Sequence, residues 1–192
     1  MQVQFTVGKR YLDPLLKYIN EAFALSCLPD IQERKLFPNA KEWTESMATY
    51  NAVRKCLKRF ALNDSRVSLV SVGDGHTPRT AALFAFRTAW QCYSIDPNVA
   101  VRDYKIQRLS VYRKRIENIP PWNFLGPLVI VAVHSHASLQ EAVNRLRSET
   151  DRAVVAMPCC YKQEIDERKP DVSYKDAGIW SPHNLIKIWE KV

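Results

Sequence analysis

Residues 67–97 read VSLVSVGDGHTPRTAALFAFRTAWQCYSIDP, and this stretch decides the fold. The apolar run Val67–Val72 ends in a glycine turn, which predicts a buried strand. We expect a helix over residues 77–88 and a second strand over Trp90–Ile95, which ends on Asp96. A strand, a glycine turn, a helix and a strand that ends on an acid form the arrangement in which α/β proteins hold dinucleotide-like ligands.

Two of the five glycines in the chain, Gly73 and Gly75, lie in this turn. Glycine lets the backbone approach a ligand closely, and the N-terminus of the following helix then faces that ligand. Thr77 and Pro78 are typical of an N-cap and a first helical residue. An acid at the position of Asp96 can bind ribose hydroxyls, although Asp-Pro is also a common turn signal.

From Ser65 onward, expected strands and helices alternate, which predicts an α/β three-layer sandwich around a mostly parallel sheet. The run 109–117 is polar and is expected at an edge of the sheet. The last two strands are expected to pair as an antiparallel hairpin. Besides those already named, the expected elements are the strands 109–117, 128–133, 153–157, 174–180 and 185–189 and the helix 138–147.

Residues 1–64 are expected to form a helical leader that packs on, or caps, the domain formed by residues 65–192. Helical spacing of leucines predicts a first helix over residues 9–28, which Leu28-Pro29 stops because proline disfavours helix in the residue before it. A connection follows over residues 30–40. A second helix is expected from Lys41 or Glu42 to about Leu62.

Composition narrows the class of protein. The chain has 192 residues, a net charge of +8 and a pI of about 9.3, which favours an anionic partner such as nucleic acid, although a solvated basic surface has the same composition. Five cysteines without a CxxC pair indicate reduced thiols. The sequence has no apolar run of membrane-spanning length and no signal-peptide core at its start, so we expect a cytoplasmic protein with no membrane partner.

Chemically distinctive residues gather at the ends of the expected strands. Because the carboxyl ends of parallel strands meet at one edge of a sheet, we expect these segments to surround one ligand site. The segments are Gly73–Thr77, Asp96, Glu117, His134–His136 and Pro158–Tyr161.

With its terminal hairpin, the layout of residues 65–192 resembles class I S-adenosylmethionine-dependent methyltransferases, whose sheet has seven strands, the last antiparallel. In that family the glycine loop lies against the methionine part of the cofactor and the acid after the second strand binds the ribose. The resemblance therefore implies S-adenosylmethionine as cofactor. The cofactor-binding residues that it implies are Gly73, Asp74, Gly75, His76, Thr77, Asp96 and Pro97.

A narrower likeness lies in the stretches Val131–Ala137 and Val154–Gln163, which contain His134-Ser135-His136 and Pro158-Cys159-Cys160. They resemble a subgroup that carries a His-Ala-Cys-Asp-like stretch after the fourth strand and Pro-Cys-Cys after the fifth, and that includes tRNA ribose methyltransferases and uncharacterised relatives. The chain departs from the family at four positions. Ser71 stands where an acid is usual, Thr77 where a glycine is usual, and His136 and Ala137 where the cysteine and aspartate of the subgroup stand; Asp74 could substitute for the lost acid.

The expected catalytic residues are His134, His136 and Tyr161, which would face the methyl acceptor. Either histidine could be a general base, a stacking group or a core histidine. Cys159-Cys160 could form the wall of the pocket, supply a nucleophile, or bind zinc with the two histidines; we expect the wall and no metal. The residues expected to bind substrate are Arg79, Arg113, Arg115 and Cys159.

Arg79 and His76 begin the helix after the glycine turn and could bind the carboxylate of the methionine or an anionic substrate. The basic residues around Arg113 could follow a phosphate backbone or simply protect an edge strand. The predicted function is methyl transfer to RNA or another anionic acceptor, with a possible protein partner subunit. The alternative is a catalytically degenerate methyltransferase-fold module that binds nucleic acid or a protein.

Overall fold

The structure, a computed structural model of the chain, describes residues 9–160 and 164–192, and residues 9–13 by their backbone alone. Its main feature is a seven-stranded sheet in the order β3-β2-β1-β5-β7-β9-β8. All neighbours pair in parallel except β9, which is antiparallel to both β7 and β8. The strands are β1 (Ser68–Val72), β2 (Gln91–Ile95), β3 (Leu109–Tyr112), β5 (Leu128–Val133), β7 (Arg152–Met157), β8 (Val172–Lys175) and β9 (Leu185–Trp189). The predicted fold class is confirmed.

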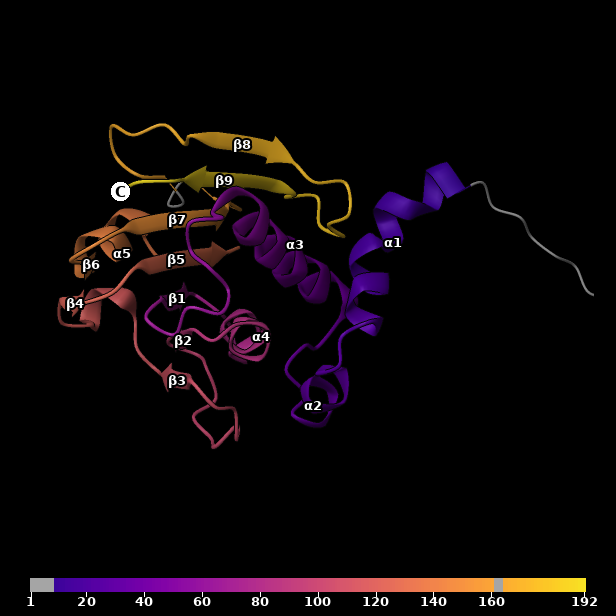
Figure 1. Cartoon of the computed structure of the whole chain (residues 1–192), viewed down its shortest axis with the longest axis horizontal. Helices are drawn as coiled ribbons and strands as arrows, with labels where there is room; N and C mark the ends of the chain where they lie inside the picture. The colour runs from indigo at the N-terminus through magenta and orange to yellow at the C-terminus, as the bar shows by residue number, and fades with distance from the viewer. Residues whose placement is uncertain (1–8, 161–163) are drawn as a thin grey trace, which may run out of the picture.

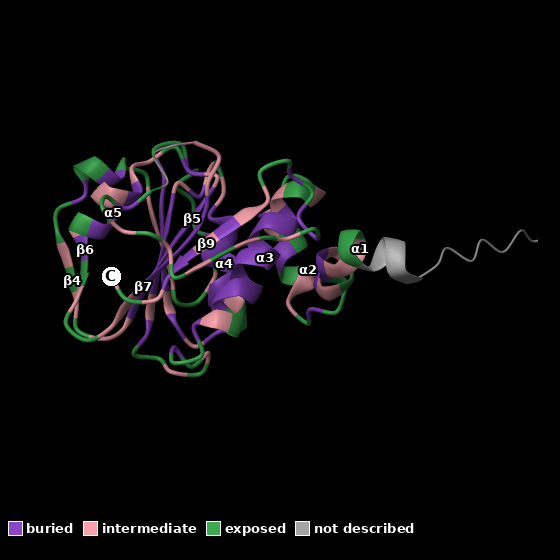
Figure 2. Ribbon diagram, turned by 90° about the horizontal axis from the view of Figure 1, so that it is seen from above, coloured by how far each residue is buried: buried purple, intermediate pink, exposed green. Residues whose placement is uncertain are grey.

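The helices lie on both faces of this sheet (Figures 1 and 2). One face is covered by α3 (Ala40–Cys56) and α4 (Arg79–Arg87), with α1 (Lys9–Phe23) and α2 (Leu28–Glu33) outside them. The other face carries α5 (Leu139–Arg145) and a small parallel pair, β4 (Trp122–Phe124) and β6 (Leu146–Ser148). A short 3₁₀ helix, Ile116–Asn118, precedes β4.

The central strand β5 is apolar along its whole length because helices cover both faces of the sheet there. All six residues of β5, Leu-Val-Ile-Val-Ala-Val, are buried, whereas every residue of the edge strand β3 is half-buried. Alternate side chains of β5 enter two separate cores: Val129 joins the core under α3 and α4, and Ile130 joins the core under α5. The sheet therefore has two buried faces, and its loops are left at its ends.

The helical leader shares its core with the sheet. Tyr18 of α1 and Met47 of α3 belong to the same buried cluster as Leu69 of β1 and Val131 of β5. Figure 2 shows α3 as buried as the strands beneath it. Every residue from Trp43 to Val53 is buried, so α3 is a layer of the sandwich and its polar side chains face the protein. A domain boundary at residue 65 stays a prediction.

Several expected boundaries were wrong, for local reasons. Pro29 begins α2 instead of ending α1, because proline is tolerated in the first turn of a helix. The expected strand 109–117 ends at Tyr112, and the short strand β4, which begins at Trp122, was not predicted. Helix α3 ends at Cys56, six residues before the expected end, and the first strand of the hairpin is Val172–Lys175. Among the described residues, no helix combines the length and the apolar character needed to cross a membrane.

Candidate functional site

A cavity of about 410 Å³ opens at the carboxyl ends of β1, β2 and β5. It lies at the switch point of the sheet, because β1 is flanked by β2 on one side and by β5 on the other. Four segments line it, and each contains residues that the sequence predicts to meet there: the glycine turn, residues 95–98, residues 114–117 with Glu117, and residues 134–137.

The glycine turn is fixed to the ends of both neighbouring strands. Gly73 has φ +73°, and a Cβ there would lie 2.0 Å from Oγ of Ser135, so the turn packs directly against the end of β5. Gly75 has φ +82°, and its N–H donates to Oδ2 of Asp96 at 2.9 Å. Both positions require glycine because L side chains rarely adopt this backbone conformation.

Asp74 lies between these glycines but points into the protein. Its side chain is buried, and its two carboxylate oxygens accept the backbone N–H groups of Thr80 and Ala81 at 3.0 and 3.1 Å. Ser94 of β2 donates to the same carboxylate at 3.1 Å. Asp74 thus supplies the helix cap that the sequence predicts for Thr77, and α4 begins at Arg79. Its side chain is committed to the N-terminus of α4.

His76 and Thr77 connect the turn to its surroundings and do not line the cavity. The hydroxyl of Thr77 donates to the carbonyl of Leu36 at 2.5 Å, so it holds the turn to the leader. His76 is exposed, and its Nδ1 lies 3.3 Å from the carbonyl oxygen of Asn98.

Asp96 faces the cavity and is 8% exposed. Oδ2 accepts from Gly75, and Oδ1 accepts from the N–H of Asn98 at 2.7 Å. Asp96 therefore holds the backbone of the turn and also faces the cavity. Each carboxylate oxygen has two lone pairs, so each can accept one further hydrogen bond from a ligand. Pro97 lines the cavity next to Asp96.

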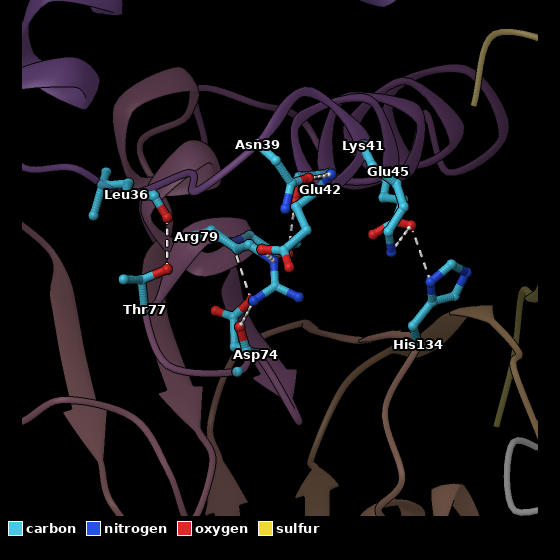
Figure 3. A network of polar contacts seen from close by, with 12 residues as sticks. Leu36, Asn39, Lys41, Glu42, Glu45, Asp74, Thr77, Arg79 and His134 are labelled. Carbon is cyan, nitrogen blue, oxygen red and sulfur yellow. Dashed lines mark hydrogen bonds and ion pairs between the residues drawn. The ribbon is translucent and has the colours of Figure 1, made fainter. Parts of the chain in front are cut away.

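Arg79 reaches the cavity from the first turn of α4 (Figure 3). One of its terminal nitrogens donates to the carbonyl oxygen of Asp74. Its Nε lies 3.2 Å from a carboxylate oxygen of Glu42 on α3, in an orientation that makes an ion pair and no hydrogen bond. The guanidinium is thus held in place on one side and lies against the cavity with donors to spare.

His134 ends β5 in a left-handed conformation, with φ +47°, and lines the cavity. Its Nδ1 lies 3.0 Å from a carboxylate oxygen of Glu45 of α3 (Figure 3), and its Nε2 lies 2.8 Å from the carbonyl oxygen of His183. Each ring nitrogen thus faces a hydrogen-bond acceptor. The two contacts hold the ring in one orientation.

Glu45, the partner of His134 on α3, is buried and only 1% exposed. Burial by itself would raise the pKa of Glu45, but the hydrogen bond and charge of His134, together with Lys41 at 2.9 Å, outweigh burial and lower this pKa. Its second carboxylate oxygen has no partner among the described residues. Glu45 is therefore a positioning residue behind His134.

His136 and the cysteine pair lie on the other side of Ser135. His136 is exposed and lines the cavity, whereas Cys159 and Cys160 are half-buried and lie 4.0 and 3.9 Å from the carbonyl oxygen of Ser135. Burial first, and then the neighbouring Cys160, raise the pKa of the Cys159 thiol, which does not favour a free thiolate nucleophile. Tyr161 lies outside the described residues.

Part of the basic stretch is exposed beside the cavity. Arg113, Lys114 and Arg115 are all exposed, and Lys114 and Arg115 line the cavity itself. Arg108, in contrast, donates to two backbone carbonyls of the α4 region, and Arg102 lies over the ring of Tyr104. The basic residues therefore divide into a cavity-side group and a structural group.

The sequence interpretation missed Glu42 and Glu45, which reach the site from the leader. No clear signal was present, because an acid at position 45 also fits the solvent-exposed side of an amphipathic helix. A buried acid needs a charged partner. The partner could not be identified from sequence spacing, since His134 follows Glu45 by 89 positions.

No protein-family model matches the chain, and no curated protein matches its sequence. Among solved structures, a Methanococcus maripaludis protein, provisionally described as an S-adenosyl-L-methionine-dependent methyltransferase, is 13% identical with a TM-score of 0.47. That match covers 67% of this chain and 62% of the other, so the chain spans less than two thirds of its length. A mutant of MtNAS in complex with S-adenosylmethionine is 14% identical with a TM-score of 0.49, over 98% of this chain and 84% of the other. Likenesses this distant assign no family to the chain.

Proposed function

We propose that the cavity binds S-adenosylmethionine and that the chain transfers a methyl group to an anionic acceptor, for which RNA is our choice. The observation that supports this is the joining of the glycine turn to Asp96 across the ends of β1 and β2. It occurs at the switch point of a seven-stranded sheet whose β9 is reversed, which is the layout that the sequence resemblance implied.

The residues present fit such a cofactor. A cavity of about 410 Å³ is within the usual range of small-molecule sites. Asp96 can accept ribose hydroxyls with the lone pairs that its backbone contacts leave free. Arg79 offers a fixed positive charge for a carboxylate, and the glycines keep the turn open to a close approach.

The cofactor, when bound, supplies a methyl group on a sulfonium, which is a good leaving group. The protein then has mainly to hold the acceptor in line and exclude water. His134, held in one orientation by Glu45, and His136 both line the cavity. Tyr161 and Cys159 stay part of the proposal as residues near the acceptor.

The binding experiment is calorimetric titration with S-adenosylmethionine. We expect the wild type to bind, and Asp96→Ala to weaken binding by about 10- to 100-fold, the usual effect of losing hydrogen bonds to a charged group. Asp96→Asn removes the negative charge but keeps one oxygen that can accept from the backbone. Comparing it with Asp96→Ala therefore separates the effect of the lost charge from the effect of a disrupted turn. Asp166→Ala removes an exposed acid outside the cavity and is the control. A wild type that does not bind at millimolar cofactor would contradict the proposal.

RNA as the acceptor is supported by the exposed basic group beside the cavity. Reversing two charges in Arg113→Glu/Arg115→Glu should weaken RNA binding and reduce the slope of log K against log salt, by about one for each phosphate that the variant no longer binds. Lys55→Glu/Lys58→Glu makes the same change of charge at exposed positions near the C-terminus of α3 and is the matched control. Equal effects of the two variants would mean that net charge alone drives binding.

The second candidate, a catalytically degenerate module, is favoured by one observation. Ser71, which stands where the family has an acid, is buried in β1, and the nearby Asp74 is committed to the α4 cap. Neither residue replaces the lost acid at the cavity. RNA binding that is intact, and unaffected by S-adenosylmethionine, together with no calorimetric signal for the cofactor, would establish this candidate.

A further inference from the structure

Three metal-ligating side chains meet where β5 and β7 end. One ring nitrogen of His136 and the sulfur atoms of Cys159 and Cys160 all lie within 4.8 Å of one another. Among the described residues, no other group of three His, Cys, Asp or Glu side chains comes together in this way. The residues follow two neighbouring strands and are brought together by the parallel pairing of β5 with β7.

The backbone conformation allows the two adjacent cysteines to face the same side. In an extended chain, neighbouring side chains point to opposite faces, so two adjacent thiols cannot bind one ion. Here the chain bends at residues 159 and 160, and both sulfur atoms approach the same carbonyl oxygen, that of Ser135, at 4.0 and 3.9 Å. The bend therefore turns Cys159 and Cys160 to one side.

The two histidines of the segment have different roles. His134 is committed to Glu45 and to the carbonyl oxygen of His183, which excludes it from a ligand set. Among the described residues, the ring of exposed His136 makes no hydrogen bond, so its ligand nitrogen is available. The structure thus separates the positioning histidine from the ligating one.

The donor set selects the ion. Two thiolates and one imidazole suit Zn²⁺ and other thiophilic cations, and hard cations such as Mg²⁺ prefer oxygen. Zinc at about 2.3 Å from sulfur and about 2.0 Å from nitrogen needs ligand atoms less than about 4 Å apart. The ligand atoms here lie within 4.8 Å of one another, so they exceed that separation by at most about 1 Å.

The electrostatic environment supports a cation at this point. The carboxylate of Glu45 is the acidic group that acts on Cys159 from α3. Each thiol loses its proton as its sulfur binds a metal ion, so binding of a divalent cation strengthens as the pH rises.

We propose that His136, Cys159 and Cys160 form a binding site for a thiophilic cation of the Zn²⁺ class, beside the cavity. Three protein ligands leave a fourth position for water or a substrate atom, which is typical of catalytic rather than structural zinc sites. The site does not depend on methyl transfer, since every ligand is a side chain of the described fold.

The test is an anaerobic titration of the reduced full chain with Co²⁺, a spectroscopic substitute for Zn²⁺. We expect one equivalent to produce thiolate-to-cobalt absorption, and Zn²⁺ to displace it. Cys159→Ser and Cys160→Ser should each weaken binding at least tenfold, and His136→Ala should weaken binding while the thiolate absorption remains. Cys56→Ser, at another half-buried cysteine, is the matched control and should bind like the wild type.

Folding of the variants is checked by far-ultraviolet circular dichroism without metal. A second measurement uses the wild type alone: Zn²⁺ should slow alkylation of Cys159 and Cys160, mapped by mass spectrometry, and leave Cys56 unaffected. A wild type with no thiolate absorption, an absorption that survives in Cys159→Ser/Cys160→Ser, or alkylation that Zn²⁺ does not change would each overturn the proposal.

Discussion

The two halves of the cavity are built differently. On the β1–β2 side, carboxylates hold the backbone: Asp74 caps α4, and Asp96 joins Gly75 to Asn98. On the β5–β7 side, the contact is between two side chains, because the carboxylate of Glu45 fixes the ring of His134. The ring of the nearby His136 makes no hydrogen bond among the described residues. The first side therefore fixes the backbone around the cavity, and the second side orients the side chains that face it.

The largest expected effect tests the first side. Asp74→Ala leaves two buried N–H groups of α4 and the hydroxyl of Ser94 without their acceptor. We expect the free energy of unfolding to fall by about 3 kcal/mol, from the lost cap and the unpaired donors. Urea denaturation measures it. Asp74→Asn keeps one acceptor oxygen and should lose less. A loss below about 1 kcal/mol in Asp74→Ala would mean that the cap is not structural.

A smaller effect distinguishes the two glycines of the turn. Gly73→Ala combines positive φ with a Cβ 2.0 Å from Oγ and 2.6 Å from Cβ of Ser135, which sits on fixed backbone. Gly75→Ala has similar backbone strain, but its Cβ meets the far end of the long Arg79 side chain at 2.3 Å, which can shift at the cost of its contacts with Asp74 and Glu42. We expect losses of about 3 and about 1 kcal/mol, measured by thermal or urea unfolding.

A second-site change sharpens this comparison. Ser135→Gly, combined with Gly73→Ala, removes the contact but not the backbone strain, so it should restore part of the lost stability relative to Ser135→Gly alone. Equal losses for the two glycine variants, or no recovery in the double variant, would mean that strain alone makes the turn require glycine.

The smallest expected effect is a pH dependence on the second side. The pKa of Glu45 is lowered in the folded protein, so its charged form stabilises the fold above the unfolded-state pKa of about 4.5, and that stability is lost as the pH falls through the folded value. We expect wild-type stability to fall more steeply than that of Glu45→Gln from about pH 5 downward. Glu33→Gln, at an exposed acid, is the control. Parallel curves for wild type and Glu45→Gln would remove the role assigned to the Glu45–His134 pair.

The sequence predicted the sheet and the convergence of its ends, because both depend on local patterns. Apolar runs such as β5 and glycine turns such as Gly73–Gly75 determine where strands form and stop. Strand ends then meet at one edge by topology. Boundaries failed where tertiary contacts decided, as at Tyr112, after which the chain turns into a 3₁₀ helix under the second core.

By itself, the sequence determined the α/β class, the position of the site and the residue types at its rim. Only the tertiary structure decided that Asp96 and not Asp74 faces the cavity, and that the ring of His136, unlike that of His134, makes no hydrogen bond to any residue the structure describes. The physical reason is that a buried polar group must find a partner, and the partner comes from a distant element. Asp74 bonds to the N-terminus of α4, and His134 bonds to Glu45 on α3. Asp96 and His136 keep hydrogen-bonding capacity to spare, and both line the cavity.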